Sequence, residues 1–461
     1  MQMLIRVFFI TLLFCATLTN AQELKRRASH GVTLRLVDSA IAKQLKMDKA
    51  EGMLVQYIFP NSNAAKAGLQ NNDVIISINN VLMNDFSALS DMKVKIIEGD
   101  QIIYKIFRQG KEIEMILQAI GKPKEQEEGL EFEYGQFSFD QGLIRTIITA
   151  DKDAKKKPAI LFVPGFTCFS QDNMGVNHPY KKLVYHLAKK GFLVMRAEKP
   201  GMGDSNNKQK CVDIDFDTEV ASYREALKAL YKHPKVDANN VFIFGHSLGG
   251  MEAPFIAEDF NVKGIITMGI TIKHWREYLT EMLRNQIPRL GENYVQAEKD
   301  LKLYEVLLYE LLVNNKTPSE MILKNEEYGR ILQRDFGLVN SDNFLGRNIR
   351  FSQSLNNKNC IEAWLKTEAK ILSVWGDSDI QVINDFSHRE LVDIVNKNNP
   401  NNATFLELKG TDHNFLKIGS LEESYRINRG GNIAALLPTH FDYDAIDKIV
   451  KWINNTVSIK D

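Results

Sequence analysis

The chain has 461 residues, in which 58 Lys and Arg balance 58 Asp and Glu. This length exceeds the usual size of one domain, so two or three domains with substantial cores are expected. The neutral balance supplies no bulk electrostatic field for nucleic acid or anionic lipid, which favours a small molecule or a protein as the substrate.

Residues 1–21 have the pattern of a cleaved signal peptide. They contain an early basic residue, Arg6, within an apolar stretch from Leu4 to Leu18, and the small residue Ala21 precedes Gln22. The apolar stretch is shorter than the ~20 residues that a membrane span needs, and the sequence shows no second candidate span. We therefore expect an exported protein, periplasmic or secreted, with no stable membrane span; a membrane anchor is the alternative.

Three cysteines remain after such a cleavage, and they are widely spaced: Cys168, Cys211 and Cys360. Their number and spacing indicate neither a disulfide framework nor a zinc site. One bridge is possible in an oxidising compartment, but we expect burial as small apolar residues instead. The histidines also lack metal-ligand spacing, so we expect no metal and no other cofactor.

A charged, proline-containing segment, GKPKEQEEG at residues 121–129, separates two regions of different pattern. Such a composition is typical of a linker. We expect a small β-rich domain over residues 24–120 and a larger domain over residues 130–461.

The smaller region alternates short strands with a short helix. Strand-like runs at residues 53–59 and 74–78 flank a helix that ends near Gly68, and two alternating strands meet at Gln109-Gly110, a hairpin signal. Three stretches resemble the helix, the aspartate-led strand and the following turn of PDZ domains in periplasmic trypsin-like proteases: Ala64-Ala65-Lys66-Ala67-Gly68-Leu69, Asp73-Val74-Ile75 and Ile78-Asn79.

This resemblance implies a peptide-binding loop. PDZ domains add a partner's C-terminal strand to a sheet edge and bind its carboxylate with backbone N–H groups. The corresponding loop here is Ser29, His30, Gly31 and Val32. Since His30 replaces an apolar residue of the family, the alternative is a degenerate module that only packs against its neighbour. The implied partner is a protein C-terminus or an internal peptide.

From residue 130 onward, strand-like and helix-like segments alternate. Continuous apolar strands between amphipathic helices predict an α/β fold with a doubly wound, mostly parallel sheet covered on both faces. The alternation is interrupted between residues 271 and 366 by helical stretches such as LKLYEVLLYELLV. An insertion at this place lies over the strands' C-terminal edge, where ligands bind, so we expect a lid. The alternative is a helical layer with no role in substrate choice.

Ser247 lies in GHSLGG, where an apolar strand-like run meets a helix. The glycines around it leave room for a sharp turn that lifts the hydroxyl clear of the sheet at a helix N-terminus. A serine hydroxyl needs a base to remove its proton, so a histidine and an acid must follow in the chain. Asp377 and Asp379 follow one strand-like run, and His413 follows the next.

The order Ser, Asp, His, with each residue just after a strand, resembles the α/β-hydrolase superfamily over residues 130–458. The resemblance implies that Ser247 is the nucleophile, that His413 is general base and then acid, and that Asp379 fixes the imidazole tautomer. It places the acid three residues after Gly376, which favours Asp379 over Asp377. Asp412, beside the histidine, is expected to be a solvated loop residue.

The same resemblance implies an oxyanion hole made of two backbone N–H groups. One belongs to Leu248, directly after the nucleophile, and the other to Phe166 in PGFTCF, with Thr167 as its rival. The turn EKPGMGDS at residues 198–205 is expected to shape the site and to do no chemistry.

Together these features predict an exported serine hydrolase that cleaves carboxylic esters through an acyl-enzyme. Peptidases share the fold and the triad, so a peptidase or aminopeptidase is the first alternative, with Glu277 or Glu281 as the anion for a substrate amine. A non-catalytic binding protein, in which PDZ contacts on a hydrolase scaffold are the function, is the second. The complete set of Ser, Asp and His argues against it.

Overall fold

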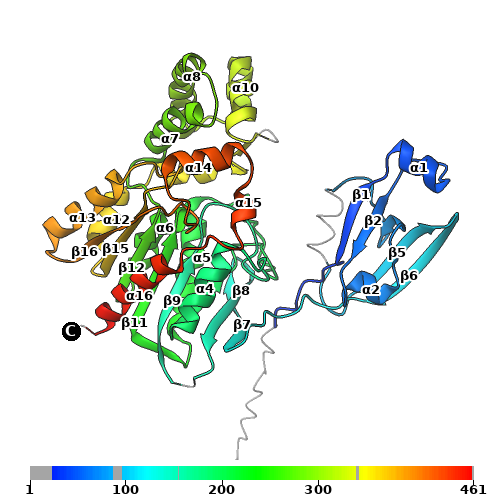
Figure 1. Ribbon diagram of the computed structural model, residues 1–461, viewed down its shortest axis with the longest axis horizontal. Coiled ribbons are helices and arrows are strands. Elements are labelled where there is room, and N and C mark those ends of the chain that lie inside the picture. The colour runs from blue at the N-terminus through cyan, green and yellow to red at the C-terminus, as the bar shows by residue number, and fades with distance from the viewer. Residues whose placement is uncertain (1–22, 87–95, 154, 339–341, 459–461) are drawn as a thin grey trace, which may run out of the picture.

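A computed structural model describes residues 23–86, 96–153, 155–338 and 342–458 (Figure 1). The predicted signal peptide, residues 1–21, lies outside this range. Figure 1 shows a small β-rich unit formed by the N-terminal part, and a larger unit in which helices surround a sheet. None of the helices in the described ranges is both long enough and apolar enough to cross a membrane.

The small unit is an antiparallel sheet with strand order β1-β2-β3-β5-β6 and β4 paired with β3. Its core consists of alternate strand residues such as Val55, Ile75 and Ile106. The predicted hairpin is confirmed: Arg108 pairs with Lys111, and Gln109 and Gly110 both have positive φ, as a two-residue turn requires. The bounds are β1 (Val32–Leu36), α1 (Ser39–Leu45), β2 (Met53–Ile58), α2 (Asn63–Ala67), β3 (Val74–Ile78), β4 (Val81–Leu82), β5 (Gln101–Arg108) and β6 (Lys111–Gln118).

The larger unit contains an eight-stranded sheet of order β16-β15-β12-β11-β9-β10-β8-β7. From β10 to β16 neighbouring strands pair in parallel, and β8 pairs antiparallel with both β10 and β7. The predicted mostly parallel sheet is confirmed. The bounds are β7 (Leu130–Phe139), β8 (Gly142–Asp151), β9 (Lys157–Val163), β10 (Leu193–Ala197), β11 (Val236–His246), β12 (Gly264–Met268), β15 (Lys370–Gly376) and β16 (Ala403–Leu408).

Helices cover both faces of this sheet, as its continuous apolar strands predict. In β9, Leu161 and Val163 belong to the core under one set of helices, whereas Ile160 and Phe162 belong to the core under the other. The first set is α5 (Phe216–Tyr231), α6 (Leu248–Ala257), α12 (Cys360–Lys366) and α13 (Phe386–Asn398), and the second is α4 (Pro179–Lys189) and α16 (Tyr443–Val457). Full burial of each such side chain stabilises the fold by about 1.5–3 kcal/mol.

The chain between β12 and β15 forms the helical insertion, and its helices α7, α8 and α10 stand above the sheet at the top of Figure 1. The elements that precede α12 are α7 (Trp275–Arg289), α8 (Tyr294–Leu312), α9 (Pro318–Lys324), α10 (Glu326–Asp335), β13 (Asn343–Phe344), β14 (Arg347–Asn348) and α11 (Ile349–Asn356). Two further helices, α14 (Leu421–Arg429) and α15 (Ile433–Leu436), follow β16.

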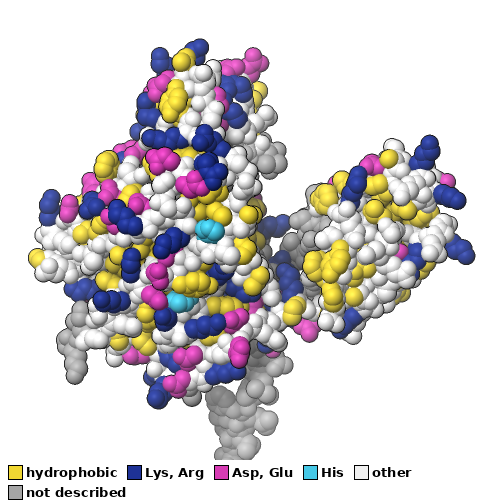
Figure 2. Space-filling view, viewed as in Figure 1, with side chains coloured by type: hydrophobic (Ala, Val, Ile, Leu, Met, Phe, Trp, Pro, Cys, Tyr) yellow, Lys and Arg dark blue, Asp and Glu magenta, His cyan; other side chains and the backbone are white. Residues whose placement is uncertain are grey.

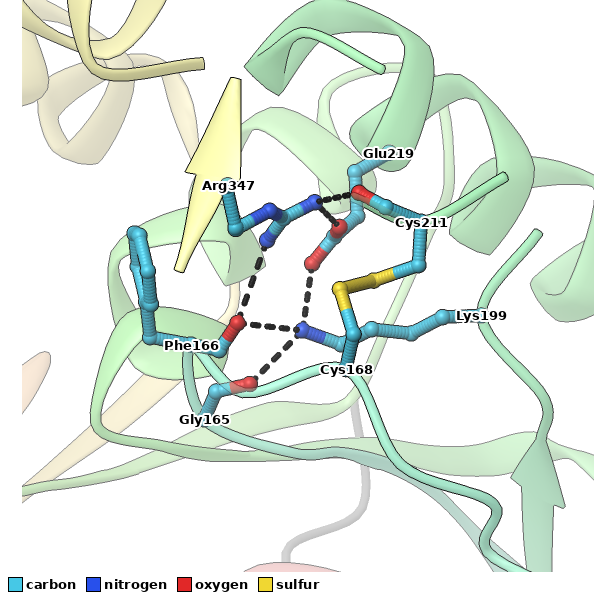
Figure 3. The surroundings of a disulfide bond; sticks show 7 residues. All are labelled: Gly165, Phe166, Cys168, Lys199, Cys211, Glu219 and Arg347. Atoms are coloured by element: carbon cyan, nitrogen blue, oxygen red, sulfur yellow. Dashed lines mark hydrogen bonds and ion pairs between the residues drawn. A yellow bond between two sulfur atoms is a disulfide. The ribbon is translucent and has the colours of Figure 1, made fainter. Parts of the chain in front are cut away.

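One expectation about the cysteines is wrong. Cys168 and Cys211 form a disulfide across a sequence separation of 43 residues, with their Cα atoms 5.8 Å apart (Figure 3). Among the cysteines in the described ranges, Cys360 is the one that is free, and it is buried. The bridge joins the loop after β9 to the loop after β10, two segments that only the folded sheet brings together.

The segments on either side of the small sheet contact the larger unit through buried charges. Arg26 lies between Asp204 at 2.5 Å and Asp172 at 2.7 Å. Glu125, within the segment predicted as a linker, is buried against the Arg196 guanidinium. Both segments are therefore anchored at these points, and the division of the chain into domains stays a prediction.

Candidate active site

Ser247 occupies the sharp turn between β11 and α6. Its φ of 54° and ψ of −124° lie in a strained region for a residue with a side chain. Its side chain makes no capping hydrogen bond to α6, so its hydroxyl does not serve to cap that helix. The flanking glycines are required by contact: a Cβ on Gly249 would lie 2.2 Å from the Val163 carbonyl oxygen, and one on Gly245 would lie 2.5 Å from the Cα of Gly250.

His413 and Asp379 form a buried pair. The Nδ1 of His413 lies 2.6 Å from Oδ2 of Asp379, and both residues are almost fully buried. The second carboxylate oxygen of Asp379 accepts hydrogen bonds from the backbone N–H groups of Gln381 and Val382. These contacts orient the carboxylate toward Nδ1 of the imidazole, so Nε2 is the ring nitrogen that faces away from Asp379.

The environment of His413 favours its charged form. Burial lowers the pKa of the imidazole, but the negative charge of Asp379 and its hydrogen bond outweigh burial and raise the pKa above its ordinary value. A base with a raised pKa gains driving force for proton abstraction.

Asp377 and Asp412, the two other acids near this pair, have structural contacts. Oδ1 of Asp377 accepts the Gly410 N–H at 2.6 Å and braces the turn after β16. Asp412 accepts the N–H groups of Asn414 and Leu416 and is buried, so its expected place in a solvated loop is wrong. Burial raises the pKa of Asp412 to about 6.

The segment after β12 lies beside both Ser247 and the acid–base pair. The Ser247 N–H donates to the Met268 carbonyl oxygen at 2.8 Å. A Cβ on the next residue, Gly269, would lie 2.8 Å from His413 Cε1 and 3.2 Å from Asp379 Oδ2. The structure thus brings the three predicted residues around one backbone segment that only a glycine fits.

A hydrogen-bonded chain that the sequence did not reveal supports this arrangement from behind. The Gly165 N–H donates to Tyr180 Oη at 3.0 Å, Tyr180 Oη lies 2.7 Å from His246 Nδ1, and His246 Nε2 lies 2.7 Å from the His413 carbonyl oxygen. Because a carbonyl only accepts, His246 carries its proton on Nε2 and Tyr180 donates to Nδ1. Burial lowers the pKa of His246 to about 3, which keeps it neutral.

Ser247 opens into a cavity of about 240 Å³. The predicted oxyanion donors Phe166 and Leu248 line it, and so does the rival Thr167. The Phe166 ring stacks on Trp275 of the insertion, with ring centroids 6.1 Å apart. The remaining lining residues are Met251, Gly269, Thr271, Tyr278, Leu279, Met282, Leu345, Gln381 and Val382. The insertion therefore forms part of the wall around Ser247.

The predicted peptide-binding loop, Ser29–Val32, is distant in sequence from these residues. It leads into β1, which begins at Val32 and is an edge strand of the small sheet. The ring of His30 is buried, with Nδ1 2.5 Å from Tyr104 Oη. The carbonyl oxygens of His30 and Gly31 accept N–H groups of Ala64 and Phe59. His30 thus fills the position of the family's apolar residue as a buried, hydrogen-bonded side chain.

Comparison with known families agrees with the observed sheet. A family model described as alpha/beta hydrolase fold matches residues 158–419, more than half of the chain. The chain belongs to the alpha/beta hydrolase fold family. This hydrolase-fold chain also matches a PDZ domain model over residues 22–99, which confirms the predicted resemblance of its N-terminal part to PDZ domains.

Individual relatives cover only parts of the chain. A probable periplasmic serine endoprotease DegP-like from Chlamydia trachomatis is 39% identical over 85 residues, 18% of this chain and 17% of that protein. Esterase EstD from Thermotoga maritima is 29% identical over 139 residues, 30% of this chain and 32% of that protein. The chain thus spans at most about a third of these relatives.

The chain also has similarities to solved structures. A structure titled ferulic acid bound to Est1E, from Butyrivibrio proteoclasticus, is 14% identical with a TM-score of 0.39, and the match covers 66% of this chain and 98% of that one. At this identity the likeness concerns the fold alone.

Proposed function

We propose that this protein is an exported serine hydrolase that cleaves carboxylic esters through an acyl-enzyme on Ser247. The observation that carries the proposal is the buried 2.6 Å contact between His413 and Asp379 beside the strained turn of Ser247. A scaffold has no physical need for a strained serine and a matched acid and base.

The chemistry follows from the position of each group. The Ser247 hydroxyl attacks the ester carbonyl while His413 Nε2 takes its proton, and Asp379 stabilises the imidazolium that forms. Backbone N–H groups of Leu248 and Phe166 bind the oxyanion of the tetrahedral intermediate. His413 then protonates the departing alcohol, and a water activated by the same imidazole releases the acid.

The contacts of two glutamates favour esters over the aminopeptidase alternative. Glu281 is paired with Lys273 at 2.7 Å and also accepts from Asn384. Glu277 is exposed and lies 4.0 Å from the same lysine. Glu281 is thus used by two contacts, and Glu277 lines a different hollow from the cavity of Ser247. The EstD relative is named an esterase, which agrees with this preference.

The shape of the cavity favours a short or flat acyl group. Its volume is about 240 Å³, and aromatic rings of Phe166, Trp275 and Tyr278 line it. Drug-sized ligands occupy pockets of about 300–1,000 Å³, so this cavity fits a smaller group.

The first experiment combines labelling and turnover. A fluorophosphonate probe should label the wild-type protein on Ser247, and Ser247→Ala should abolish labelling and lower kcat by about 10⁶. A panel of p-nitrophenyl esters of several chain lengths, with aminoacyl-nitroanilides beside it, separates esterase from peptidase. Wild-type-like hydrolysis by Ser247→Ala contradicts the proposal, and a folded wild-type protein that refuses the probe supports the binding scaffold.

We also propose export and peptide binding for this chain. The disulfide supports export because such bonds persist in oxidising compartments. The relatives that match the PDZ part of the chain are named periplasmic endoproteases, which also supports export. The PDZ match supports capture of a peptide carboxylate by the loop Ser29–Val32. Isolation of the protein from periplasmic and cytoplasmic fractions, with its N-terminal sequence, tests the first of these.

A further inference from the structure

Two buried cations contact the backbone carbonyls of the loop after β9 (Figure 3). Lys199 Nζ donates to the Gly165 carbonyl oxygen at 2.7 Å and lies 3.4 Å from that of Phe166. Arg347 Nη1 donates to the Phe166 carbonyl oxygen at 3.2 Å. Both side chains are almost completely withdrawn from solvent.

The cations come from parts of the chain that are distant in sequence. Lys199 follows β10 in the turn EKPGMGDS, and Arg347 begins β14 of the helical insertion. Glu219 on α5 joins them, with one oxygen 2.7 Å from Lys199 Nζ and the other on Arg347 Nη2. Burying two such cations is costly unless their donors are used. Here Lys199 Nζ and both Nη groups of Arg347 have acceptors, and the loop carbonyls are among them.

The cluster also contains a fourth ionisable group, Glu252 on α6. Burial, and then the neighbouring carboxylate of Glu219, raise the pKa of Glu252 well above its ordinary value. Burial lowers the pKa of Lys199, and the charge of Glu219 opposes that shift. The geometry pairs both cations with Glu219 and directs other donors of each to the loop carbonyls.

The geometry of a peptide group turns these contacts into control of N–H direction. In a trans peptide the C=O and the N–H point in opposite directions. Lys199 on the Gly165 C=O therefore directs the Phe166 N–H away from the cluster, and Arg347 on the Phe166 C=O does the same for the Thr167 N–H. A hydrogen bond to the C=O also polarises the peptide group and strengthens the opposite N–H as a donor.

Phe166, Thr167 and Ser247 line the same cavity. We propose that Lys199 and Arg347 are positioning residues of the oxyanion hole, which aim and strengthen the Phe166 and Thr167 N–H donors through their peptide carbonyls, with Glu219 orienting both cations. This inference rests on the proposed ester hydrolysis. It agrees with the expectation that the turn at residues 198–205 shapes the site, and it names Lys199 as the residue of the turn that does so.

A comparison of oxo-esters with matched thiono-esters tests the inference, because oxyanion donors bind a developing O⁻ better than S⁻. Lys199→Met should lower kcat for the oxo-ester by about 100-fold and the oxo-to-thiono ratio of kcat/KM by about tenfold. KM should change by less than about threefold, because the lost interaction is made in the transition state. Arg347→Met should act in the same direction by a smaller factor, about tenfold in kcat, since it acts on the rival donor.

Lys157→Met is the matched control. Lys157 is also buried and paired with a carboxylate, Asp151 at 2.6 Å, but it begins β9 at the end of the strand opposite the oxyanion loop. Its loss should lower the unfolding temperature, as the loss of Lys199 should, without changing the oxo-to-thiono ratio. The ratio therefore separates positioning from a general loss of stability.

The outcomes distinguish the inference from the proposed function. A wild-type protein that cleaves no ester and takes no fluorophosphonate refutes the proposed function. An active wild type whose ratio is unchanged in Lys199→Met overturns the positioning role while the function stands. Should Lys199→Met fail to fold, Arg347→Lys decides, since it keeps the charge but loses the fork that reaches both Phe166 and the Cys211 carbonyl; an unchanged ratio there overturns the inference.

Discussion

Two loops of this molecule are proposed to present backbone N–H groups to a negatively charged oxygen, and they are built differently. In the loop Gly165–Thr167, carbonyl oxygens accept from the buried cations Lys199 and Arg347. In the loop Ser29–Val32, the carbonyl oxygens of His30 and Gly31 accept backbone N–H groups of Ala64 and Phe59. The first loop lies beside the strained serine, and the second lies beside the open end of a sheet.

The difference follows from how long the negative charge exists at each loop. A peptide carboxylate is charged before it binds and can adjust its position during binding, whereas an oxyanion exists only in a short-lived intermediate. Donors for the latter must be aimed before the reaction, because reorganisation at that moment adds to the barrier. We infer that buried cations behind a loop mark preorganisation for reaction, and that neutral backbone contacts suffice for binding.

The largest expected effect separates the chemistry of the two loops. Asp379→Asn should lower kcat by about 10⁴, because the imidazole of His413 loses its orienting acceptor. Binding of a peptide at Ser29–Val32 should be unchanged, as measured by fluorescence anisotropy. The matched variant is Asp377→Asn, whose carboxylate braces a turn through Gly410 and should affect kcat by less than about tenfold. The reverse order of the two variants contradicts the assignment of the acid.

The next effect concerns the covalent anchor of the first loop. Replacement of Cys168 and Cys211 by serine opens a loop of 43 residues and should lower the free energy of unfolding by about 4 kcal/mol. Urea unfolding measures this, and kcat measured well below the transition shows whether the loop also loses its geometry. Cys360→Ala, at the free buried cysteine, is the control that closes no loop. Equal losses in the two variants would show that the bridge does not stabilise the fold.

A smaller effect is the pH dependence of the hydrolysis. His413 must be neutral to accept a proton, so kcat/KM should fall tenfold per pH unit below its raised pKa, which lies above 6.5. The stabilisation by the protonated ring is complete below the ordinary pKa and is lost as the pH rises through the raised value. Activity and this share of the stability therefore change in opposite directions. NMR titration of the ring in Asp379→Asn should show a lower pKa, and an unchanged value would show that Asp379 is not its cause.

The smallest effect on catalysis is expected at the second loop. Gly31 has a φ of +70°, and an added Cβ would lie 2.1 Å from Ser62 Cβ. Gly31→Ala should weaken peptide binding by about tenfold or more, because such strain costs of order 1–3 kcal/mol. Its kcat for a p-nitrophenyl ester should equal that of wild type.

Gly68→Ala is the matched control, since Gly68 also has positive φ but nothing lies within 4 Å of its added Cβ. A peptide with a free carboxylate should bind the control normally, and the same peptide with an amidated end should not bind. A loss of kcat in Gly31→Ala that Gly68→Ala does not share would show that the two loops are coupled and do not act independently.

Local patterns in the sequence were sufficient for the elements and for the order of the candidate site. Continuous apolar strands between amphipathic helices predicted the parallel sheet, and two alternating strands joined at Gln109-Gly110 predicted the hairpin. The glycines around Ser247 predicted its sharp turn, and the positions after two strands indicated Asp377, Asp379 and His413. The resemblance to the α/β-hydrolase superfamily then favoured Asp379. Such features depend on side-chain period and steric demand over a few residues, which the sequence carries directly.

Only the tertiary structure decided which distant groups meet. The sequence could not show the bridge between Cys168 and Cys211, the burial of Asp412, or the contact of His30 with Tyr104. Nor could it show that Lys199 and Arg347, 148 positions apart in the printed chain, reach adjacent carbonyls of one loop. Hydrogen bonds and ion pairs require donor–acceptor distances that are correct to within a few tenths of an ångström. These distances are fixed only when the sheet, the helices and the insertion pack together.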